Sequence, residues 1–516
     1  MRYYSTNGKA PLATLEKAVV KGLAEDKGLY MPERIKPLPQ EFFDNIQDMS
    51  LQEIAYRVAD CFFGEDVDAE SLRKIVNETL SFDIPLVKVE KETLSNSPLK
   101  GEDNEALSLR ESLGGSIYSL ELFHGPTLAF KDVGARFMAR LLRYFTSSSS
   151  SASSTSFTSS TSPASLINVL VATSGDTGAA VANGFLGVEG IHVYVLYPKG
   201  KVSPIQECQF TTLGQNITAL EVDGVFDDCQ ALVKNAFMDE ELNAQMRLTS
   251  ANSINVARFL PQSFYYFWAY AQLKKTLSNS PETLSNSPLK GEKPGELTSS
   301  SDCFSAKEAS PLRGGLEGSG GLEGSVVCCV PSGNFGNICS ALFGKRMGLP
   351  ISRFIAANNA NDIFYKYIQT GKYDPKPSVQ TIANAMDVGD PSNFARILDL
   401  YGKSHEAICK DISGATYTDE QIAETMRQCL AETGYQLDPH GACGYRALQE
   451  GLREGEVGFF IETAHPAKFK QTVDSICGGD VAIPERLQAF MKGTKQSIPM
   501  SKDYDSFKAF LKAQTH

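Results

Sequence analysis

The sequence predicts an α/β fold in which a mainly parallel β-sheet carries helices on both faces. Three short apolar runs rich in β-branched residues predict buried strands, at 166–171, 191–196 and 326–330. The first and the third are each followed by a glycine-containing turn and then by a helical pattern. Strand–turn–helix units of this kind build parallel sheets, whose ligands bind at the carboxyl ends of the strands.

Composition and charge restrict the class of protein. The chain of 516 residues is 42% hydrophobic and carries a formal net charge of -12, so it has apolar material for a large core spread over several domains. An acidic surface argues against nucleic acid as a partner, because the phosphate backbone favours basic patches. No apolar run approaches the length of a membrane span, and the N-terminus lacks a signal-peptide pattern. We therefore expect no membrane partner and a cytoplasmic location.

The eleven cysteines form no Cys-x-x-Cys pair, and the histidines are isolated in the sequence. Neither residue type shows the spacing of metal ligands. An odd number of cysteines fits a reducing compartment. The sequence therefore predicts no metal site.

Changes of composition along the chain mark its domains. Polar stretches at about 90–108, 146–162 and 274–324 are rich in Ser, Gly and Pro, and the decapeptide at 93–102 recurs at 283–292. Such tracts bury too little apolar surface to offset the entropy of ordering, so we expect disordered insertions. The other expected units are an N-terminal domain (1–88) with an amphipathic helix at 51–62, a central domain (110–480) with a small mobile subdomain at about 165–215, and a C-terminal helical extension (481–516).

The first motif that carries chemistry is HGPTLAFKD at 124–132. Pro126 interrupts regular structure, and apolar residues then recur at helical spacing from Phe130 to Leu141. Lys131 is thus expected near the start of a helix, where the positive end of the helix dipole disfavours its protonated form. A neutral lysine amine can form a Schiff base with an aldehyde.

Three further motifs have the residues of anion-binding turns. TSGDTG (173–178) and PSGNFGN (331–337) each lie between a predicted strand and a helix, so that backbone N–H groups and a helix N-terminus face a ligand. SANSINVAR (250–258) adds Arg258, whose guanidinium can bind a phosphate with two parallel hydrogen bonds. Each pattern alone is also typical of an N-capped helix after a turn. A fifth motif, TAHPAKFK, begins with Thr463 at a strand end, where its hydroxyl can contact a ring nitrogen.

Together these motifs closely resemble those of the threonine synthases, in the subgroup with a separate N-terminal domain. GLAEDKGLYMP (22–32) and NAMDVGDPSN (384–393) match the same family, and the resemblance covers about 3–480 apart from the insertions. It implies a pyridoxal 5'-phosphate (PLP) enzyme of fold type II, the tryptophan-synthase-β-like fold, with parallel-sheet catalytic domains. It further implies conversion of O-phospho-L-homoserine and water to L-threonine and phosphate, by a monomer or homodimer.

The resemblance implies a role for each motif residue. Lys131 would bind PLP covalently and move substrate protons. Asp176 would lie beside the 3′-oxygen of the cofactor; because an ionised aspartate repels a phenolate, we expect a shared or retained proton there. The other cofactor residues would be Thr463 at the pyridine nitrogen and, around the cofactor phosphate, Gly333, Asn334, Phe335, Gly336 and Asn337. The substrate carboxylate would be bound by Ser174 and Thr177. The substrate phosphate would be bound by Asn252, Ser253 and Arg258.

Other activities share these motifs. A PLP-dependent phospho-lyase that forms 2-oxobutyrate, or a cysteate-type synthase that uses phosphoserine, would need the same cofactor residues. Such enzymes differ in how the reaction ends after phosphate leaves. A catalytically inactive relative that serves as a scaffold is a third alternative, and the intact Lys131, PSGNFGN and TAHPAKFK argue against it.

Overall fold

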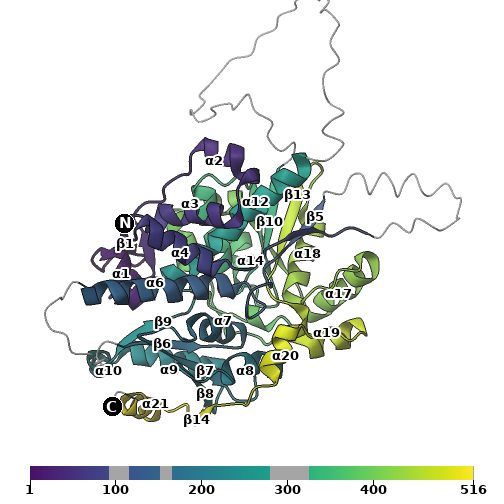
Figure 1. Ribbon diagram of the computed structural model, residues 1–516. Helices are drawn as coiled ribbons and strands as arrows, with labels where there is room; N and C mark the ends of the chain where they lie inside the picture. The colour runs from purple at the N-terminus through teal and green to yellow at the C-terminus, as the bar shows by residue number, and fades with distance from the viewer. Residues whose placement is uncertain (92–115, 152–165, 279–324, 515–516) are drawn as a thin grey trace, which may run out of the picture.

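The apolar runs of the sequence become buried strands in two of three sheets. The computed structural model describes residues 1–91, 116–151, 166–278 and 325–514 (Figure 1). Within them, a small antiparallel sheet belongs to the N-terminal domain, a six-stranded sheet forms the centre and a five-stranded parallel sheet forms a second layer. The predicted α/β fold is thus confirmed.

The N-terminal domain packs a few helices against a short sheet of order β2-β1-β3. Its helices begin at polar caps, as where Ser50 accepts from the N–H of Glu53 and Asp68 from that of Ser71. The expected amphipathic helix at 51–62 is confirmed as α3. The elements are β1 (Arg2–Ser5), β2 (Ala13–Thr14), α1 (Leu15–Lys21), β3 (Tyr30–Pro32), α2 (Gln40–Asn45), α3 (Leu51–Phe63) and α4 (Ala69–Thr79).

The central sheet has the order β12-β11-β10-β13-β5-β4, and all its neighbouring strands are parallel except β4 and β5. Its strands are β4 (Leu86–Lys88), β5 (Ile117–Glu121), β10 (Val326–Pro331), β11 (Arg353–Asn358), β12 (Ile412–Thr416) and β13 (Val457–Glu462). Its helices are α6 (Lys131–Ser151), α12 (Ser263–Ser278), α13 (Gly336–Arg346), α14 (Ile363–Thr370), α15 (Phe394–Leu400), α16 (His405–Asp411), α17 (Asp419–Thr433), α18 (Pro439–Gly451) and α19 (Lys470–Cys477).

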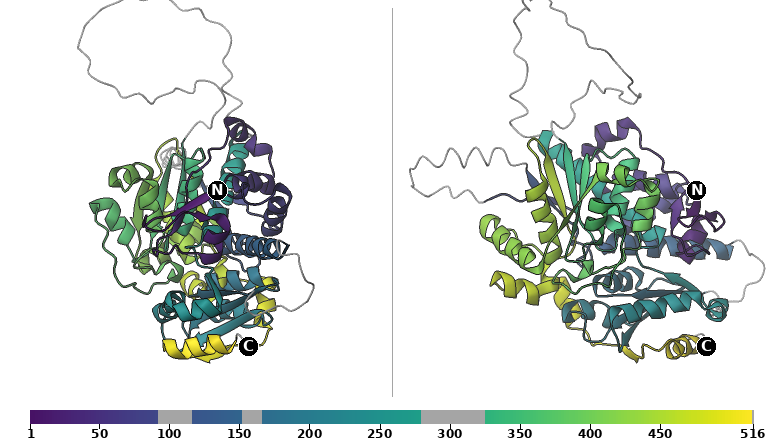
Figure 2. Two further views of the ribbon diagram at one scale, coloured as in Figure 1. Left: turned by 90° about the vertical axis from the view of Figure 1, so that its left-hand side faces the viewer. Right: turned by 180° about the vertical axis from the view of Figure 1, so that it is seen from behind.

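The second sheet has the order β14-β8-β7-β6-β9, with every pair parallel. Figures 1 and 2 show it below the central sheet, with the C-terminal helix along its outer side. Its elements are β6 (Ile167–Ala172), α7 (Asp176–Phe185), β7 (Ile191–Pro198), α8 (Pro204–Thr211), β8 (Ile217–Val222), α9 (Phe226–Met238), α10 (Glu240–Gln245), β9 (Arg247–Ser250), α11 (Val256–Phe259), α20 (Glu485–Met491), β14 (Ile498–Met500) and α21 (Tyr504–Ala513).

Alternate side chains of β10 and of β6 enter different cores. In β10, Cys328 joins the largest apolar cluster, whereas Val327 joins a second cluster on the other face. In β6, Val169 joins that same largest cluster, whereas Leu170 joins a third. Both faces of each strand are therefore buried, which explains why these strands appear as continuous apolar runs rather than as alternating patterns. The largest cluster therefore contains side chains from both sheets and packs them together.

Several boundaries differ from those expected. Sheet pairing extends the subdomain expected at about 165–215 through β9 and adds β14, because β14 pairs with β8. The expected helical extension at 481–516 therefore contains a strand. The insertions expected at 90–108, 146–162 and 274–324 lie mostly outside the described residues. The described edges of the second and third insertions are helical, since α6 continues to Ser151 and α12 to Ser278. Among the described residues, no helix has both the length and the apolarity of a membrane span.

Candidate active site

A cavity of about 860 Å³ lies where strands of both sheets end. The cavity is lined by the last residues of three strands, Ala172 of β6, Pro198 of β7 and Pro331 of β10, and by Thr463 directly after β13. Parallel strands place their following loops at one edge, which is where such folds bind ligands. All of the site residues expected from the sequence line this cavity, except Asp176.

The segment before Lys131 is fixed by two neighbours. The N–H of Phe130 donates to the carbonyl oxygen of Thr463 at 2.9 Å, so the lysine motif and the threonine motif are joined across the cavity wall. The carboxylate of Asp132 accepts from both the N–H and the hydroxyl of Thr127, at 2.8 and 2.6 Å. Lys131 is the first residue of α6, as the sequence predicts.

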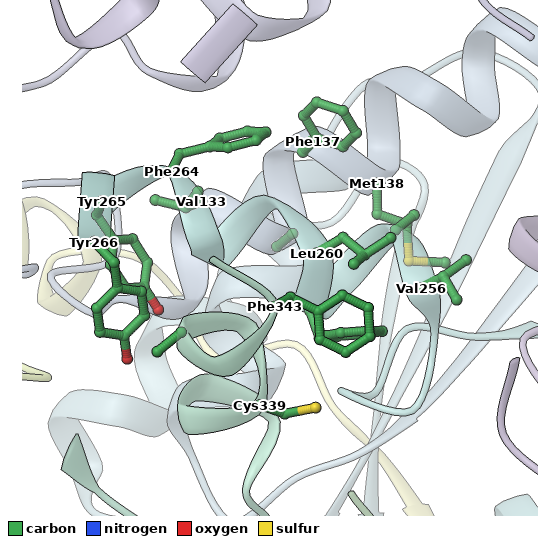
Figure 3. Packing of buried hydrophobic residues seen from close by; sticks show 14 of the residues in the cluster. Val133, Phe137, Met138, Val256, Leu260, Phe264, Tyr265, Tyr266, Cys339 and Phe343 are labelled. Atoms are coloured by element: carbon green, nitrogen blue, oxygen red, sulfur yellow. The ribbon is translucent and has the colours of Figure 1, made fainter. Parts of the chain in front are cut away.

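Three helices that carry site residues share one apolar core (Figure 3). A single buried cluster contains Val133 and Phe137 of α6, Val256 of α11 and Phe343 of α13. Gly134 allows α6 and α11 to approach closely, because a Cβ at this position would lie 2.2 Å from the carbonyl oxygen of Arg258. The positions of Lys131, Arg258 and the glycine loop are therefore set by the same packing.

Burial changes the acid–base properties of Lys131. Removal from water lowers the pKa of its amine to about 8; the nearby carboxylate of Asp176 opposes this shift, and the cations Lys468 and Arg258 contribute to it. An amine with this pKa has an appreciable neutral fraction near pH 7, which is the form that attacks an aldehyde and removes protons.

Asp176 forms an ion pair that the sequence analysis missed. Lys468 Nζ lies 2.7 Å from Asp176 Oδ1, and Gln206 Nε2 donates to the same oxygen at 2.9 Å. Burial alone would raise the pKa of Asp176, but the Lys468 and Lys131 charges outweigh it and hold this pKa well below its usual range. The ion pair with Lys468 favours an ionised Asp176 in the protein without cofactor. The shared or retained proton expected beside bound PLP stays a prediction.

The glycine loop at 331–337 has the geometry of an anion cradle. Phe335 adopts a left-handed conformation (φ 61°), and α13 starts at the next residue, so the free N–H groups of its first turn face the cavity. A Cβ on Gly333 would lie 2.8 Å from Met386 Cα, which requires glycine there. The hydroxyls of Tyr265 and Tyr266 both donate to Asn337 Oδ1. Nδ2 of the same side chain is buried and has no hydrogen-bond partner in the regions that the structure describes. That amide is thus oriented as a donor.

The turn after β6 presents two hydroxyls to the cavity. Thr173 Oγ1 accepts from the N–H of Gly175 and of Gly178, at 2.9 and 2.8 Å. These bonds fix the turn, and Ser174 and Thr177 line the cavity from it. Gly175 (φ 145°) is in the conformation that favours glycine, and its missing Cβ leaves room for the side chain of Gln206.

The motif at 250–258 contributes donors and a buried cation. Ser253 Oγ accepts from the side-chain amides of Asn334 and Asn393, at 3.0 and 3.2 Å, which leaves its hydroxyl hydrogen free to donate. Asn252 lines the same wall, and its buried Oδ1 has no partner within the described segments. Arg258 is 2% exposed, and its Nε and Nη1 lack hydrogen-bond partners among the described residues. Burial lowers the pKa of this guanidinium to about 10, so it remains charged at neutral pH.

Comparisons with known proteins identify the family. The family model for the threonine synthase N terminus matches residues 2–80, that for pyridoxal-phosphate dependent enzymes matches 322–462, and that for the threonine synthase C-terminal region matches 441–511. The chain is 36% identical over 487 residues to the threonine synthase of Serratia marcescens, with 94% of this chain and 93% of the relative covered. The chain belongs to the threonine synthase family. The threonine synthase of Haemophilus influenzae is likewise 36% identical, over 99% of both chains.

Solved structures agree with this assignment. The crystal structure of the Escherichia coli threonine synthase matches with a TM-score of 0.77 and 34% identity over 100% of both chains. The PLP-bound threonine synthase of Brucella melitensis matches with a TM-score of 0.79 and 29% identity, also over 100% of both. These matches confirm the expected fold class, and the family model confirms PLP dependence.

The residues of the cavity fit PLP. Lys131 offers an amine of lowered pKa for the aldehyde, and Thr463 offers a hydroxyl for the ring nitrogen. The first turn of α13 and the unpartnered Nδ2 of Asn337 supply donors for the phosphate. The described residues contain no group of three or more His, Cys, Asp or Glu side chains arranged for a metal ion.

The sequence analysis did not assign four residues to the site: Lys468, Gln206, His440 and Lys201. Lys468 pairs with Asp176 through Nζ, and the side chains of His440 and Lys201 line the cavity. The one indication of the buried Lys468 in the sequence was its position among the apolar residues of the segment Pro466–Phe469. Its partner lies in a distant motif, and only the folded chain brings the two together.

Proposed function

We propose that the chain converts O-phospho-L-homoserine and water to L-threonine and inorganic phosphate. The observation that carries this proposal is the buried guanidinium of Arg258, whose Nε and Nη1 have no partner in the described part of the chain. It lies in the cavity wall that also contains Lys131 and the glycine loop. A buried cation with free donors requires an anion. The glycine loop and Asn337 match the cofactor phosphate, so Arg258 is left for a second phosphate, which is carried by the substrate.

The remaining polar side chains suit the other end of such a substrate. Ser174 and Thr177 lie on the turn at the N-terminus of α7, where hydroxyls and N–H groups favour a carboxylate. Asn252 and Ser253 extend the Arg258 wall with further hydrogen-bonding groups. A substrate with a carboxylate at one end and a phosphate at the other would therefore be held at both ends, with its central carbons near Lys131.

PLP, when bound, supplies the electron sink that stabilises a carbanion beside the substrate nitrogen. Lys131 then removes the proton at the α-carbon and, in its neutral form, is the candidate base for a proton at the β-carbon. Arg258 holds the phosphate as it leaves the γ-carbon. Water supplies a hydroxyl to the β-carbon, and protons return to the γ- and α-carbons, so the atoms balance as threonine and phosphate.

The competing activity is release of phosphate with formation of 2-oxobutyrate. Both reactions need the cofactor residues and the phosphate wall, so these features alone do not separate them. The curated relatives and solved structures named threonine synthase, matched over nearly the whole chain, favour addition of water. Identification of the products separates the two directly.

The test incubates purified, PLP-loaded protein with O-phospho-L-homoserine and measures phosphate release together with the organic product by mass spectrometry. Threonine and phosphate in equal amounts are expected. Phosphate with 2-oxobutyrate would support the phospho-lyase instead. Phospho-L-serine is the control substrate, because its shorter chain should release little phosphate if Arg258 and the carboxylate turn fix the distance between the two ends.

A further inference from the structure

A buried ion pair lies next to the lysine of the active site. Lys468 is fully buried and Asp176 nearly so, and Lys468 Nζ lies 2.7 Å from Asp176 Oδ1. The same ammonium donates to the carbonyl oxygen of Thr127 at 2.8 Å, in the loop that leads to Lys131. Lys468 therefore links the carboxylate of α7 to the lysine loop.

The carboxylate is held in place from its other side by Gln206. Ser203 Oγ donates to Gln206 Oε1 at 3.0 Å, which directs Gln206 Nε2 toward Asp176 Oδ1 at 2.9 Å. Gly175 leaves the space that this amide occupies, since a Cβ there would lie 2.7 Å from it. Two donors from α8 and from the 3-10 turn Pro466–Phe469 thus converge on one carboxylate oxygen.

Three charged groups act on Lys131, each from a different element. Asp176 of α7 favours its ammonium form, whereas Lys468 and Arg258 disfavour it. The next carboxylate along α6, Asp132, is held by Thr127 rather than by Lys131. Asp176 is accordingly the anion that would stabilise a charged Lys131, and it is already neutralised by Lys468.

We propose that Lys468 is a positioning residue: by pairing with Asp176, it prevents that carboxylate from forming an ion pair with Lys131 and so favours the neutral form of the Lys131 amine. The inference rests on the proposed role of Lys131. Contacts with Asp176 and Thr127 keep Lys468 apart from the cofactor chemistry. It acts on Lys131 by neutralising Asp176 and by its own charge. Without Lys468, the unpaired Asp176 carboxylate would stabilise the ammonium form of Lys131 more strongly.

The test measures how apoprotein captures PLP as a function of pH, because only a neutral amine attacks the aldehyde. Stopped-flow absorbance gives the rate for the unaltered protein, Lys468→Met, Asp176→Asn and the double variant. In Lys468→Met the midpoint of the pH profile should move up, and a rise of one pH unit slows capture about tenfold near pH 7. In Asp176→Asn the midpoint should move down. The double variant should return toward the unaltered protein.

Lys470→Met is the matched control, since Lys470 belongs to the same motif but pairs with Asp474 and Asp480 at the surface. It should leave the pH profile unchanged. If Lys468→Met does not fold, as judged by circular dichroism, Asp176→Asn and the double variant decide, because neither contains the carboxylate that Lys468 neutralises. A profile that moves in none of these variants, or moves equally in Lys470→Met, overturns the inference.

Lys131→Ala separates this inference from the proposed function. Loss of capture in Lys131→Ala with an unchanged profile in Lys468→Met would refute only the role of Lys468. Capture by Lys131→Ala at the original rate would instead refute the role of Lys131 on which both rest.

Discussion

The guanidinium of Arg396 donates to the carbonyl oxygen of Tyr30, with Nη2 at 3.1 Å, and so joins the wall of the cavity to the N-terminal domain. The same group donates to the carbonyl oxygens of Ser253 and Ile254, in the phosphate wall, at 3.3 and 2.6 Å. Arg396 is fully buried and lies over the ring of Phe259 at 4.1 Å. One cation therefore connects the expected substrate wall to a domain that contributes no residue to the cavity lining.

Arg396→Met should destabilise the protein and weaken substrate binding together. Several buried acceptors would lose their donor, and one such loss costs about 1–3 kcal/mol, so we expect a fall in the free energy of unfolding on the order of 3 kcal/mol. Denaturant unfolding measures this loss, and the KM for phosphohomoserine should rise because Ser253 loses its support. Arg346→Met, at the exposed end of α13, is the control and should change stability by less than about 1 kcal/mol.

Lys131→Ala should abolish turnover and also the visible absorption of the bound aldehyde, while the fold is kept. The reason is that the first residue of α6 has the cavity-facing amine of lowered pKa. Absorption spectra of the purified variant with added PLP measure the effect. Lys199→Ala, at an exposed position after β7, should keep both signals. Turnover by Lys131→Ala would refute the role assigned to this lysine.

Arg258→Met should change stability and binding in opposite directions. Two nitrogens of the buried guanidinium lack partners among the residues that the structure describes, so replacement by an apolar side chain should raise the free energy of unfolding by about 1–2 kcal/mol. Loss of a buried charged partner should weaken phosphohomoserine binding by about 2–5 kcal/mol. Thermal unfolding and KM measure the two effects, with PLP affinity unchanged. An unaltered KM would show that Arg258 does not hold the substrate phosphate.

Local sequence patterns predicted those features that depend on near neighbours. Lys131 is the first residue of its helix, and the runs at 166–171 and 326–330 are strands, because spacing and β-branched residues determine both. The turns that follow the strands lie in one cavity, as parallel-sheet geometry requires. The glycine loop was predictable for the same reason, since turn residues directly after a buried strand specify it.

Features that depend on contacts between distant segments were not predictable. The ion pair of Asp176 was not predicted, because the pattern around it contains no cation, and Lys468 comes from a motif near the other end of the chain. β14 was included in a helical extension, because a three-residue strand at a sheet edge is too short for a periodic pattern. Arg396 lacks any local signal, since its acceptors are backbone carbonyl oxygens in Tyr30, Ser253 and Ile254.

Asn337→Asp should weaken binding of PLP more than Asn337→Ala does. Tyr265 and Tyr266 donate to Oδ1 of Asn337, so a carboxylate would keep these two bonds and replace the unpartnered Nδ2 donor by a negatively charged oxygen. That charge would face the expected phosphate across a buried wall, where repulsion between like charges is little screened. Titration of apoprotein with PLP should show at least a tenfold weaker Kd for Asn337→Asp, corresponding to about 1.4 kcal/mol. Asn337→Ala removes only the donor, so equal losses in the two variants would show that no phosphate lies beside this side chain.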